Sequence, residues 1–323
     1  MSQTLPVAFE HDPDAERVDV TVGGELFTAY RYDHTLPGLK KPVLHPILTP
    51  GGNHLTRGYP VDPRPEDRRD HLHHAGLWFS YGNVNGTDFW NNNDEVPEDE
   101  REEYGVTRHR GIERAEGGDD GGELTVRMAW LTPDDRAVLD QETTYAVRGR
   151  PGERVLDHRT TLSANEDVTL FDDKEGLLCV RLARELEHPP DETIAGPAED
   201  ATSDPDPTGE YLTSEGVRGT DAWGTRARWI RLTGALGGED LTVGVLDHPG
   251  NVGHPTHWVA RGYGPLGPNP IAPSIFEDAD PMDLALAAGE SLAVRYRIIV
   301  HDGTLPPEAL EDRYRAFAGA EGS

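Results

Sequence analysis

The stretch that best indicates the fold lies between residues 18 and 30 and reads Val18-Asp19-Val20-Thr21-Val22-Gly23-Gly24-Glu25-Leu26-Phe27-Thr28-Ala29-Tyr30. Apolar and polar residues alternate from Val18 to Val22, which is the period of a strand with one buried face. The two glycines supply turn conformations, and a second β-prone run, Leu26–Tyr30, follows them. The stretch therefore predicts a β-hairpin.

Similar segments recur outward from this hairpin, separated by clusters of Gly, Pro, Asp and Asn. A second hairpin is predicted from Ala227–Leu232 and Leu241–Leu246, which flank a turn at residues 237–240. The other strand-like segments are Leu124–Trp130, Ala137–Val147, Val155–Leu162, Val168–Phe171, Leu177–Ala183 and Ser291–Val300. Strands at this spacing predict an all-β fold, a large antiparallel β-sandwich, rather than βαβ units.

One helix is predicted, at the C-terminus, over residues 305–318. Thr304 can cap it, and Pro306 and Pro307 suit its first turn. Apolar residues recur in it at helical spacing, at Leu310, Tyr314 and Phe317. Residues 189–220 are acidic and rich in Pro and Gly, a composition typical of long loops that form lids or insertions. Without an internal repeat or a natural boundary, we expect a single β-sandwich domain over residues 1–323.

Charge indicates the environment and excludes one class of partner. Asp and Glu number 59 against 30 Lys and Arg, a net charge of −29, and the only lysines are Lys40, Lys41 and Lys174. The acidic residues are dispersed, as in proteins of a salt-rich cytoplasm, where molar salt shortens the screening length to about 3 Å. We therefore expect a halophilic protein with an acidic surface. No nucleic-acid partner is expected, because phosphates require a basic surface.

The sequence shows no signal that would direct it into or across a membrane. Residues 1–6 lack a basic region followed by an apolar run, and no stretch approaches the ~18 apolar residues of a membrane span. The single cysteine, Cys179, lies in an apolar run and has no cysteine partner for a disulfide. A soluble, cytoplasmic protein without a membrane partner is expected.

Residues 70–90 differ from the rest of the chain because they combine histidines, carboxylates and tryptophans. If Asp70–Tyr81 is extended, His71 and His73 share one face, and His74 lies on the other face with Trp78. A His-x-His pair on a strand is half of a metal site, so His71 and His73 are candidate ligands of a divalent metal, and no other cofactor is indicated. The alternative is that these histidines are structural and form hydrogen bonds within the protein.

Two other segments are polar where strands are expected. Lys174 and Glu175 lie between two strands, where they can act as general acid and base or form a solvated turn. Residues 247–270 combine His, Trp, Arg and Tyr, which suits sugar hydroxyls and carboxylates. The alternative for residues 247–270 is a Pro/Gly-rich connection with packed aromatic residues.

Several separated motifs make the chain recognisable. They are Asp70-His71-x-His73-His74-x-Gly76-Leu77-Trp78-Phe79, Val84-Asn85-Gly86-x-Asp88-Phe89-Trp90, Lys174-Glu175-Gly176-Leu177, Trp223-Gly224-x-Arg226-Ala227-x-Trp229, Asp247-His248-Pro249 and Gly267-Pro268-Asn269-Pro270. In these motifs the chain resembles a soluble family named "methane oxygenase PmoA"-like, a domain of unknown function. The resemblance extends over residues 26–318. One departure is Leu72, where members of that family commonly have proline.

This resemblance implies a β-sandwich similar to the galactose-mutarotase supersandwich. It also implies a role beside sugar dehydrogenases and sugar isomerases in carbohydrate catabolism. The family name refers to a membrane-embedded copper enzyme, whereas this chain has no membrane-spanning run and no copper site rich in cysteine or methionine.

We therefore predict an enzyme of sugar catabolism, an isomerase, lyase or hydrolase that performs acid/base chemistry on a sugar, an oxidised sugar or a glycoside. The predicted catalytic residues are Asp70, His71, His73, His74, Asp88, Lys174 and Glu175. The predicted substrate-binding residues are His45, Trp78, Asn85, Trp90, Trp223, Arg226, His248, His257, Trp258, Arg261 and Tyr263. We expect these segments to line a single pocket.

Two alternatives from other classes stay open. A non-catalytic sugar-binding or sensing protein would keep the tryptophans and arginines and tolerate loss of the histidines. A metal-dependent oxygenase or hydrolase would use His71 and His73 with a distant ligand such as His45, His254 or His257.

Overall fold

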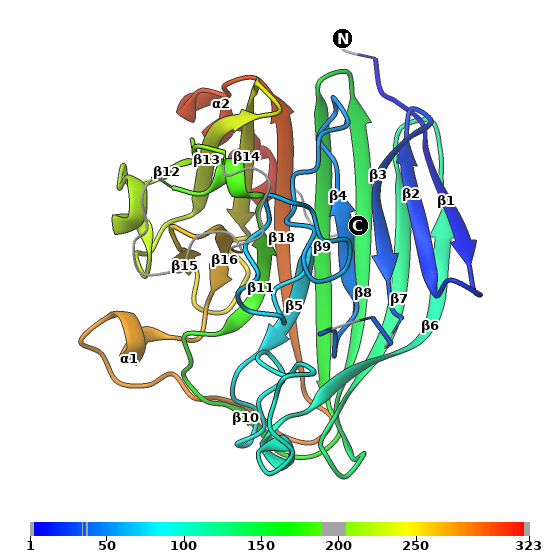
Figure 1. The fold of residues 1–323 in the computed structure, drawn as a ribbon. Coiled ribbons are helices and arrows are strands. Elements are labelled where there is room, and N and C mark those ends of the chain that lie inside the picture. Colours follow the sequence, from blue (N-terminus) through cyan, green and yellow to red (C-terminus); the bar gives the residue numbers. More distant parts are fainter. Residues whose placement is uncertain (1–2, 34, 37, 189–204, 320–323) are drawn as a thin grey trace.

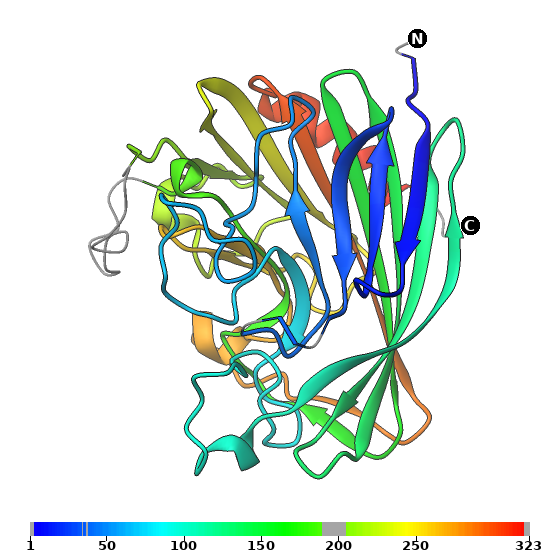
Figure 2. The ribbon, with the colours of Figure 1, turned by 45° about the vertical axis from the view of Figure 1, so that its right-hand side comes forward.

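The computed structural model describes residues 3–33, 35–36, 38–188 and 205–319. In this part of the chain, the strands form two eight-stranded sheets that face one another and one small two-stranded sheet (Figures 1 and 2). Neighbouring strands run antiparallel throughout both large sheets. The predicted all-β antiparallel sandwich is confirmed.

The elements take the following order in space. The first sheet contains β1 (Val7–Asp12), β2 (Arg17–Val22), β3 (Glu25–Arg31), β4 (Val43–Ile47), β5 (Leu77–Tyr81), β11 (Gly176–Arg181), β16 (Pro265–Asn269) and β15 (His257–Ala260). The second contains β12 (Glu210–Thr213), β13 (Trp229–Leu236), β14 (Glu239–Asp247), β18 (Ser291–Asp302), β9 (Glu153–Ala164), β8 (Ala137–Arg150), β7 (Gly122–Leu131) and β6 (Val106–Glu116). The small sheet pairs β10 (Val168–Leu170) with β17 (Leu284–Leu286), and the short 3₁₀ turns are Arg101–Glu103, Arg184–Leu186 and Gly219–Ala222.

The predicted N-terminal hairpin forms from β2 and β3. Val18, Val20 and Val22 are buried, and the polar residues between them are only half-buried. Gly23 and Gly24 both have a positive φ, +67° and +86°, which glycine adopts without steric strain. The second predicted hairpin forms from β13 and β14.

The first sheet buries both of its faces near β5 and β11. Leu178 and Val180 on β11 point into the large core between the sheets. Cys179, between them, points to the opposite face, where it packs with Trp78 of β5 and Val259 of β15. This second apolar cluster forms a floor on the outer face of the first sheet, and the functional site lies on it.

The C-terminal helix α2 (Pro307–Ala318) confirms the predicted helix, but the predicted cap is wrong: Pro306 is the N-cap residue, and Thr304 lies outside the helix. Leu310, Tyr314 and Phe317 are buried on one side of it, as their spacing indicates. They pack with Trp229 and Ile299 of the second sheet. A further single helical turn, α1 (Pro273–Phe276), was not predicted.

The predicted acidic loop at residues 189–220 is corrected for its C-terminal part. Residues 189–204 lie outside the described residues. Glu210–Thr213 is not a loop but strand β12, which pairs with β13. Tyr211 and Leu212 are buried there, and their burial outweighs the turn-rich composition around them.

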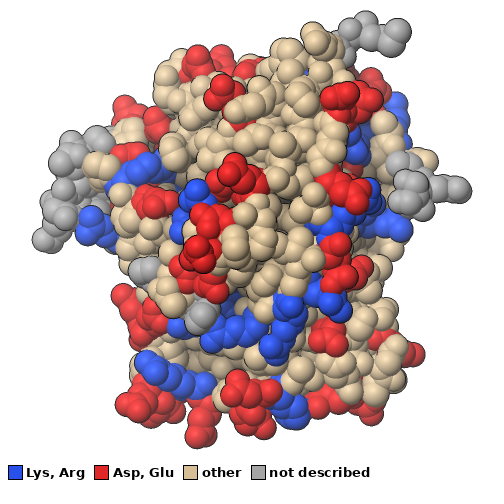
Figure 3. Space-filling model, turned by 90° about the vertical axis from the view of Figure 1, so that its right-hand side faces the viewer, with Lys and Arg blue, Asp and Glu red and all other residues tan. Residues whose placement is uncertain are grey.

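The surface carries acidic groups over a wide area. Figure 3 shows one face of the molecule, on which Asp and Glu side chains are spread from one end to the other with Lys and Arg between them. In the described residues, neither helix has the length and apolar character needed to cross a bilayer.

Candidate functional site

A cavity of about 290 Å³ lies against the apolar floor of the first sheet. Segments that are far apart in the sequence contribute to its wall: the turn after Asp70, the residues before β11, residue 223 and the β15–β16 connection. The lining residues are His71, His74, Trp90, Lys174, Glu175, Trp223, Val259, Arg261, Tyr263 and Pro265. The structure therefore brings together three of the polar segments singled out in the sequence.

The histidine segment is a turn, which corrects the prediction of an extended strand from Asp70. Only Leu77–Tyr81 forms a strand. His71 has a φ of +44°, and the His74 N–H donates to the His71 carbonyl at 3.0 Å, so the backbone folds back on itself. The three imidazole rings consequently pack together: His71 stacks on His74 at 4.8 Å, and His73 meets His74 edge-on at 4.4 Å.

Asp70 fixes the orientation of His71 at the cavity. Its Oδ2 lies 2.5 Å from Nδ1 of His71, and its two oxygens accept hydrogen bonds from Arg181 at 3.0 and 2.8 Å. Arg57 donates to Asp70 Oδ1 at 3.0 Å and to the carbonyls of His71 and His74. Burial raises the pKa of Asp70, but the bond from His71 and the charges of Arg181 and Arg57 outweigh it and hold the pKa far below its ordinary value.

This carboxylate determines which ring nitrogen of His71 carries the proton. Because Asp70 is ionised it can only accept, so Nδ1 of His71 donates to it, and the proton that the ring gains or loses is the one on Nε2. His71 lines the cavity, and about a third of its side chain is exposed. His71 can therefore take a proton from a bound molecule.

His73 and His74 differ from His71 because they are buried. Burial and then the charges of nearby cations lower the pKa of both rings well below the ordinary value. His74 is sandwiched between His71 and Trp78, and Trp78 is itself fully buried beneath it. Trp78 is thus part of the floor, which corrects its predicted role as a sugar platform.

Glu175 is a second proton-carrying group at the cavity. Burial raises its pKa, Lys174 partly counteracts this, and the negative charges of Asp173 and Asp88 raise it further. Lys174 Nζ lies 3.6 Å from Glu175 Oε1, but most of the lysine side chain is exposed. Asp88 does not line the cavity; it accepts hydrogen bonds from Trp90 N and from Asn91.

One wall of the cavity is a stack of flat groups. The guanidinium of Arg261 lies 4.0 Å from the ring centre of Trp223 and 5.6 Å from that of Tyr263. Tyr263 in turn stacks on His71 at 5.2 Å. Trp223 is 42% exposed, so its ring offers an apolar face to a ligand.

The sequence did not single out three cations that build this site. Arg57 and Arg181 hold Asp70, as described above. Lys41 is buried, and its Nζ donates to the Trp90 carbonyl at 2.7 Å. Burial lowers the pKa of Lys41 to about 7, against the opposing charges of Asp88 and Glu175. The scarcity of lysine in the chain was the available signal for Lys41.

Other predicted ligand-binding residues lie away from the cavity. His45 is buried near Asp62 at 3.6 Å. Asn85 pairs with the backbone of Asp167 and Thr169 beside β10. Trp258 points into the core between the sheets and donates to the Ala227 carbonyl, because its neighbour Val259 occupies the opposite face.

The predicted residues around 226 and 248–257 also have structural partners. Arg226 donates to the carbonyls of Gly253 and Pro255 and pairs with Glu277. His257 lies 3.3 Å from the same glutamate. His248 contacts the ring of Phe317 on α2. The expectation of a single pocket is therefore wrong for these residues.

Metal ligands are not assembled in the described part of the chain. Among those residues, no three or more His, Cys, Asp or Glu side chains are grouped so that they could hold a metal ion. The rings of His71 and His73 meet edge to face at 5.7 Å, and the carboxylate beside them, Asp70, is already bound by Arg57 and Arg181. The structure offers no third ligand for this pair among the described residues.

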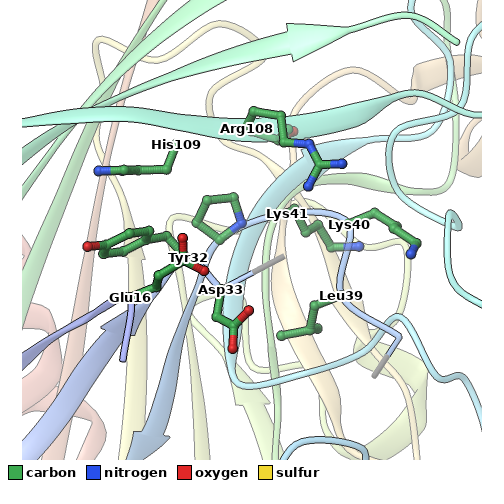
Figure 4. Close-up of a pocket in the computed structure, with 10 residues that line it drawn as sticks. Glu16, Tyr32, Asp33, Leu39, Lys40, Lys41, Arg108 and His109 are labelled. Atoms are coloured by element: carbon green, nitrogen blue, oxygen red, sulfur yellow. The ribbon is translucent and has the colours of Figure 1, made fainter. Parts of the chain in front are cut away.

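A second cavity, of about 250 Å³, lies between the end of β3 and β6. Figure 4 shows Arg108 and His109 on one side, and Glu16, Tyr32 and Asp33 opposite them. His109 stacks on Tyr32 at 4.1 Å and bonds to the hydroxyl of Tyr30 at 3.0 Å, and burial lowers the pKa of His109 to about 4. This histidine is engaged in packing and stays uncharged near neutral pH.

Comparisons with known proteins identify a family. The model described as "Family of unknown function (DUF6807)" matches residues 17–315. No curated protein matches the chain. The family match does not address the methane-oxygenase name, which stays a prediction.

Some solved structures are similar to the chain at low identity. Galactose 1-epimerase from Lactobacillus acidophilus NCFM is 10% identical, with 94% of this chain and 100% of that chain covered, at a TM-score of 0.40. A putative aldose 1-epimerase from Escherichia coli K12 is 13% identical, with coverage of 92% and 99% and a TM-score of 0.36. The GH36 alpha-galactosidase AgaB from Geobacillus stearothermophilus is 10% identical at a TM-score of 0.42, over 92% of this chain. The chain spans only 41% of AgaB and 42% of the galactosidase domain of alpha-galactosidase-sucrose kinase.

Proposed function

The chain belongs to the DUF6807 family of unknown function, and from its cavity we propose an enzyme that moves protons on a bound sugar. One observation carries this proposal. His71, which Asp70 orients, and Glu175 line the same cavity; His71 has a ring nitrogen that can accept a proton, and burial raises the pKa of Glu175. Acid/base catalysis requires such a pair within one site.

The roles follow from the protonation states. Nε2 of His71 removes a proton from a carbon next to the sugar carbonyl, and Asp70 stabilises the imidazolium that forms. Glu175, whose raised pKa favours the protonated form, donates its proton to the carbonyl oxygen or to a leaving hydroxyl. When the carbonyl oxygen is protonated, an enediol forms; the imidazolium then returns its proton to the other carbon while the Glu175 carboxylate takes the proton of the adjoining hydroxyl, which completes an isomerisation. When a hydroxyl on the next carbon is protonated, its C–O bond breaks, water leaves and a carbon–carbon double bond forms, which is an elimination.

Groups on the cavity wall suit a sugar. Trp223 offers an exposed ring face for C–H contacts. The indole N–H of Trp90 is buried and has no hydrogen-bond partner among the described residues. Trp90 lines the cavity, and because its indole N–H is enclosed by protein atoms, its contribution to the wall is the apolar ring.

Isomerisation or elimination fits these groups better than glycoside hydrolysis. Most glycosidases use two carboxyl groups, one on each side of the bond that breaks. Among the described residues that line the cavity, Glu175 is the one carboxyl group, and Asp70 beside it is held by two arginines.

The test follows carbon-bound hydrogen. The protein is incubated in D₂O at high salt with galactose, glucose, galacturonate and glucuronate, and NMR records deuterium uptake and new products. We expect uptake or conversion with the wild type, a rate at least about 100-fold lower with His71→Gln or Glu175→Gln, and no change with His11→Gln on β1.

Either of two results would contradict the proposal. If the sugars bind but no C–H bond exchanges and no product forms, the chain is a binding protein. If glycosides instead release reducing sugar at a rate that depends on Glu175, it is a hydrolase.

A further inference from the structure

The cavity is surrounded by positive charge, although the protein carries a net charge of −29. Arg261 and Lys174 line it, and Lys41, Arg57 and Arg181 lie in the wall behind it. The carboxyl groups nearby are that of Asp70, which Arg57 and Arg181 hold, and that of Glu175, whose pKa is raised by burial and by the charges of Asp173 and Asp88. After burial, Lys41, Arg57 and Arg181 lower the pKa of His73, and the neighbouring histidines with Arg181 and Arg57 lower that of His74.

The cations in the wall are already paired. Arg57 and Arg181 share the carboxylate of Asp70, and Arg57 also donates to main-chain carbonyls of the turn. Lys41 donates to the Trp90 carbonyl. These groups hold the site together and have little capacity left for a ligand.

Arg261 differs from them. Its guanidinium has no carboxylate and no hydrogen-bond acceptor among the described residues, and the rings of Trp223 and Tyr263 hold it. Its backbone is fixed as well, because Arg261 N donates to the Pro265 carbonyl at 3.1 Å and the Tyr211 hydroxyl donates to the Arg261 carbonyl at 3.0 Å. A guanidinium held by ring contacts keeps its N–H edges available for a planar, bidentate partner.

We propose that the cavity recognises an acidic monosaccharide, a uronate or another sugar acid, whose carboxylate binds the N–H edge of Arg261. Lys174 lies at the same cavity and adds a second positive charge. The volume, about 290 Å³, is just below the roughly 300–1,000 Å³ typical of ligand pockets, which suits one sugar ring. This inference rests on the proposed sugar-directed function and deepens it by naming the substrate class.

The proposal also explains why an arginine is useful next to the acid/base pair. In an elimination that removes the proton from the carbon next to the carboxylate of a uronate, a free carboxylate makes this step difficult, because negative charge accumulates there. A guanidinium on the carboxylate offsets that charge in the transition state. Arg261 would thus both select an acidic sugar and assist removal of the proton.

The experiment compares ligands that differ only in charge. Galacturonate, its methyl ester and galactose are titrated into the protein by calorimetry, at the lowest salt that keeps it folded. The same titrations use Arg261→Gln and a control, Arg136→Gln, in which an exposed arginine paired with Glu166 is replaced. We expect the wild type and Arg136→Gln to bind galacturonate about 10- to 100-fold more tightly than the two neutral sugars. Arg261→Gln should lose most of this preference, and only the smaller contribution of Lys174 should be left.

The outcomes separate this inference from the proposed function. Equal binding of the three sugars to the wild type, or a preference that is undiminished in Arg261→Gln, overturns the acidic-sugar inference and leaves a sugar-directed function standing. Binding of none of the sugars to the wild type, confirmed with glucuronate, methyl glucuronate and glucose, overturns both. A circular-dichroism melt shows that each variant is folded before titration.

Discussion

Two aspartate–histidine pairs in this protein have the same contact between the carboxylate and Nδ1 of the ring. They differ in the surroundings of the other ring nitrogen, Nε2. In the first, Asp70 accepts from His71, and the ring lines the cavity. In the second, Asp247 lies 2.7 Å from Nδ1 of His254, and Nε2 of that ring faces the Tyr314 hydroxyl at 3.4 Å. Tyr314 belongs to helix α2, and its ring stacks on that of His254 at 6.5 Å.

The difference shows what makes such a pair chemically useful. Asp247 is fully buried and also accepts from Asn251 and from the Thr256 N–H, so it joins a loop to the rest of the sandwich. Both nitrogens of His254 have partners, which makes this pair structural. His71 keeps one nitrogen for a ligand, and the same two residue types therefore form a candidate base only at the cavity.

The largest expected effect follows from exchanging each histidine for glutamine. His71→Gln removes the proposed base, so turnover should fall by about 10²- to 10⁴-fold while the protein stays folded. His254→Gln should leave turnover within about two-fold of the wild type and lower the melting temperature, because it breaks the link to Tyr314. Rates are measured with the substrate that the deuterium screen identifies.

The opposite pattern would overturn the comparison. If His254→Gln abolished turnover in a folded protein while His71→Gln did not, the active centre would lie at the second pair. A melting curve of each variant distinguishes lost chemistry from lost structure.

The next largest effect is a loss of unfolding free energy when either aspartate of the two pairs, Asp70 or Asp247, is replaced by asparagine. Asp70→Asn leaves the buried guanidinium groups of Arg57 and Arg181 without their negative partner, and removing one member of such a group costs about 3–5 kcal/mol. Asp247→Asn leaves no arginine unpaired, so we expect a loss of about 1–3 kcal/mol. Urea unfolding at constant salt measures both, and equal losses would show that the arginine pair does not depend on Asp70.

Sequence patterns predicted the sandwich because strand periodicity is a local property. Val18, Val20 and Val22 alternate, and they are buried as that alternation requires. Strand β12 was missed because its four residues lie in a segment rich in Pro and Gly, and only pairing with β13 makes them a strand. Such pairing is a long-range effect that no local pattern records.

The candidate site was predicted only in part, because the sequence shows residue types but not the backbone conformation or the contacts between distant segments. Histidine, lysine, glutamate and tryptophan at positions 71, 174, 175 and 223 were singled out by type, and they do meet at one cavity. The positive φ of His71 could not be read from the sequence, and it decides that the rings stack rather than alternate. The prediction that Trp258 binds a sugar is wrong because side chains alternate along β15: Val259 faces the cavity, and its neighbour Trp258 therefore faces the core.

A smaller effect is expected from pH, through histidines that stay neutral in the folded protein. Burial lowers the pKa of His158, between the sheets, to about 3, and His73 and His74 at the cavity are shifted in the same direction. The unfolded chain binds protons below a pH of about 6.5 and the folded protein does not, so stability falls as the pH decreases. Each such histidine should remove about 1.4 kcal/mol between neutral pH and pH 5.5.

Unfolding free energies at pH 7.5, 6.5 and 5.5 measure this dependence. His158→Leu should reduce the slope by the contribution of one histidine and leave the cavity histidines unaffected, because His158 lies between Phe79 and Tyr145 in the core. An unchanged slope in this variant would mean that His158 is protonated in the folded protein.

The smallest effect contrasts the acidic exterior with the positive cavity through their response to salt. Dispersed carboxylates repel one another when the screening length grows from about 3 Å in 1 M salt to about 10 Å in 0.1 M, so we expect the melting temperature to fall by a few degrees over that range. A carboxylate bound to Arg261 is attracted rather than repelled, so galacturonate should bind several-fold more weakly as salt rises, while galactose should show no such trend. The two measurements use one salt series, with the protein folded at every point of the titration.

A melting temperature that does not change with salt would contradict the expected adaptation to high salt. Galacturonate binding that strengthens with salt would show that the charge at the cavity has the opposite sign to the one argued from Arg261.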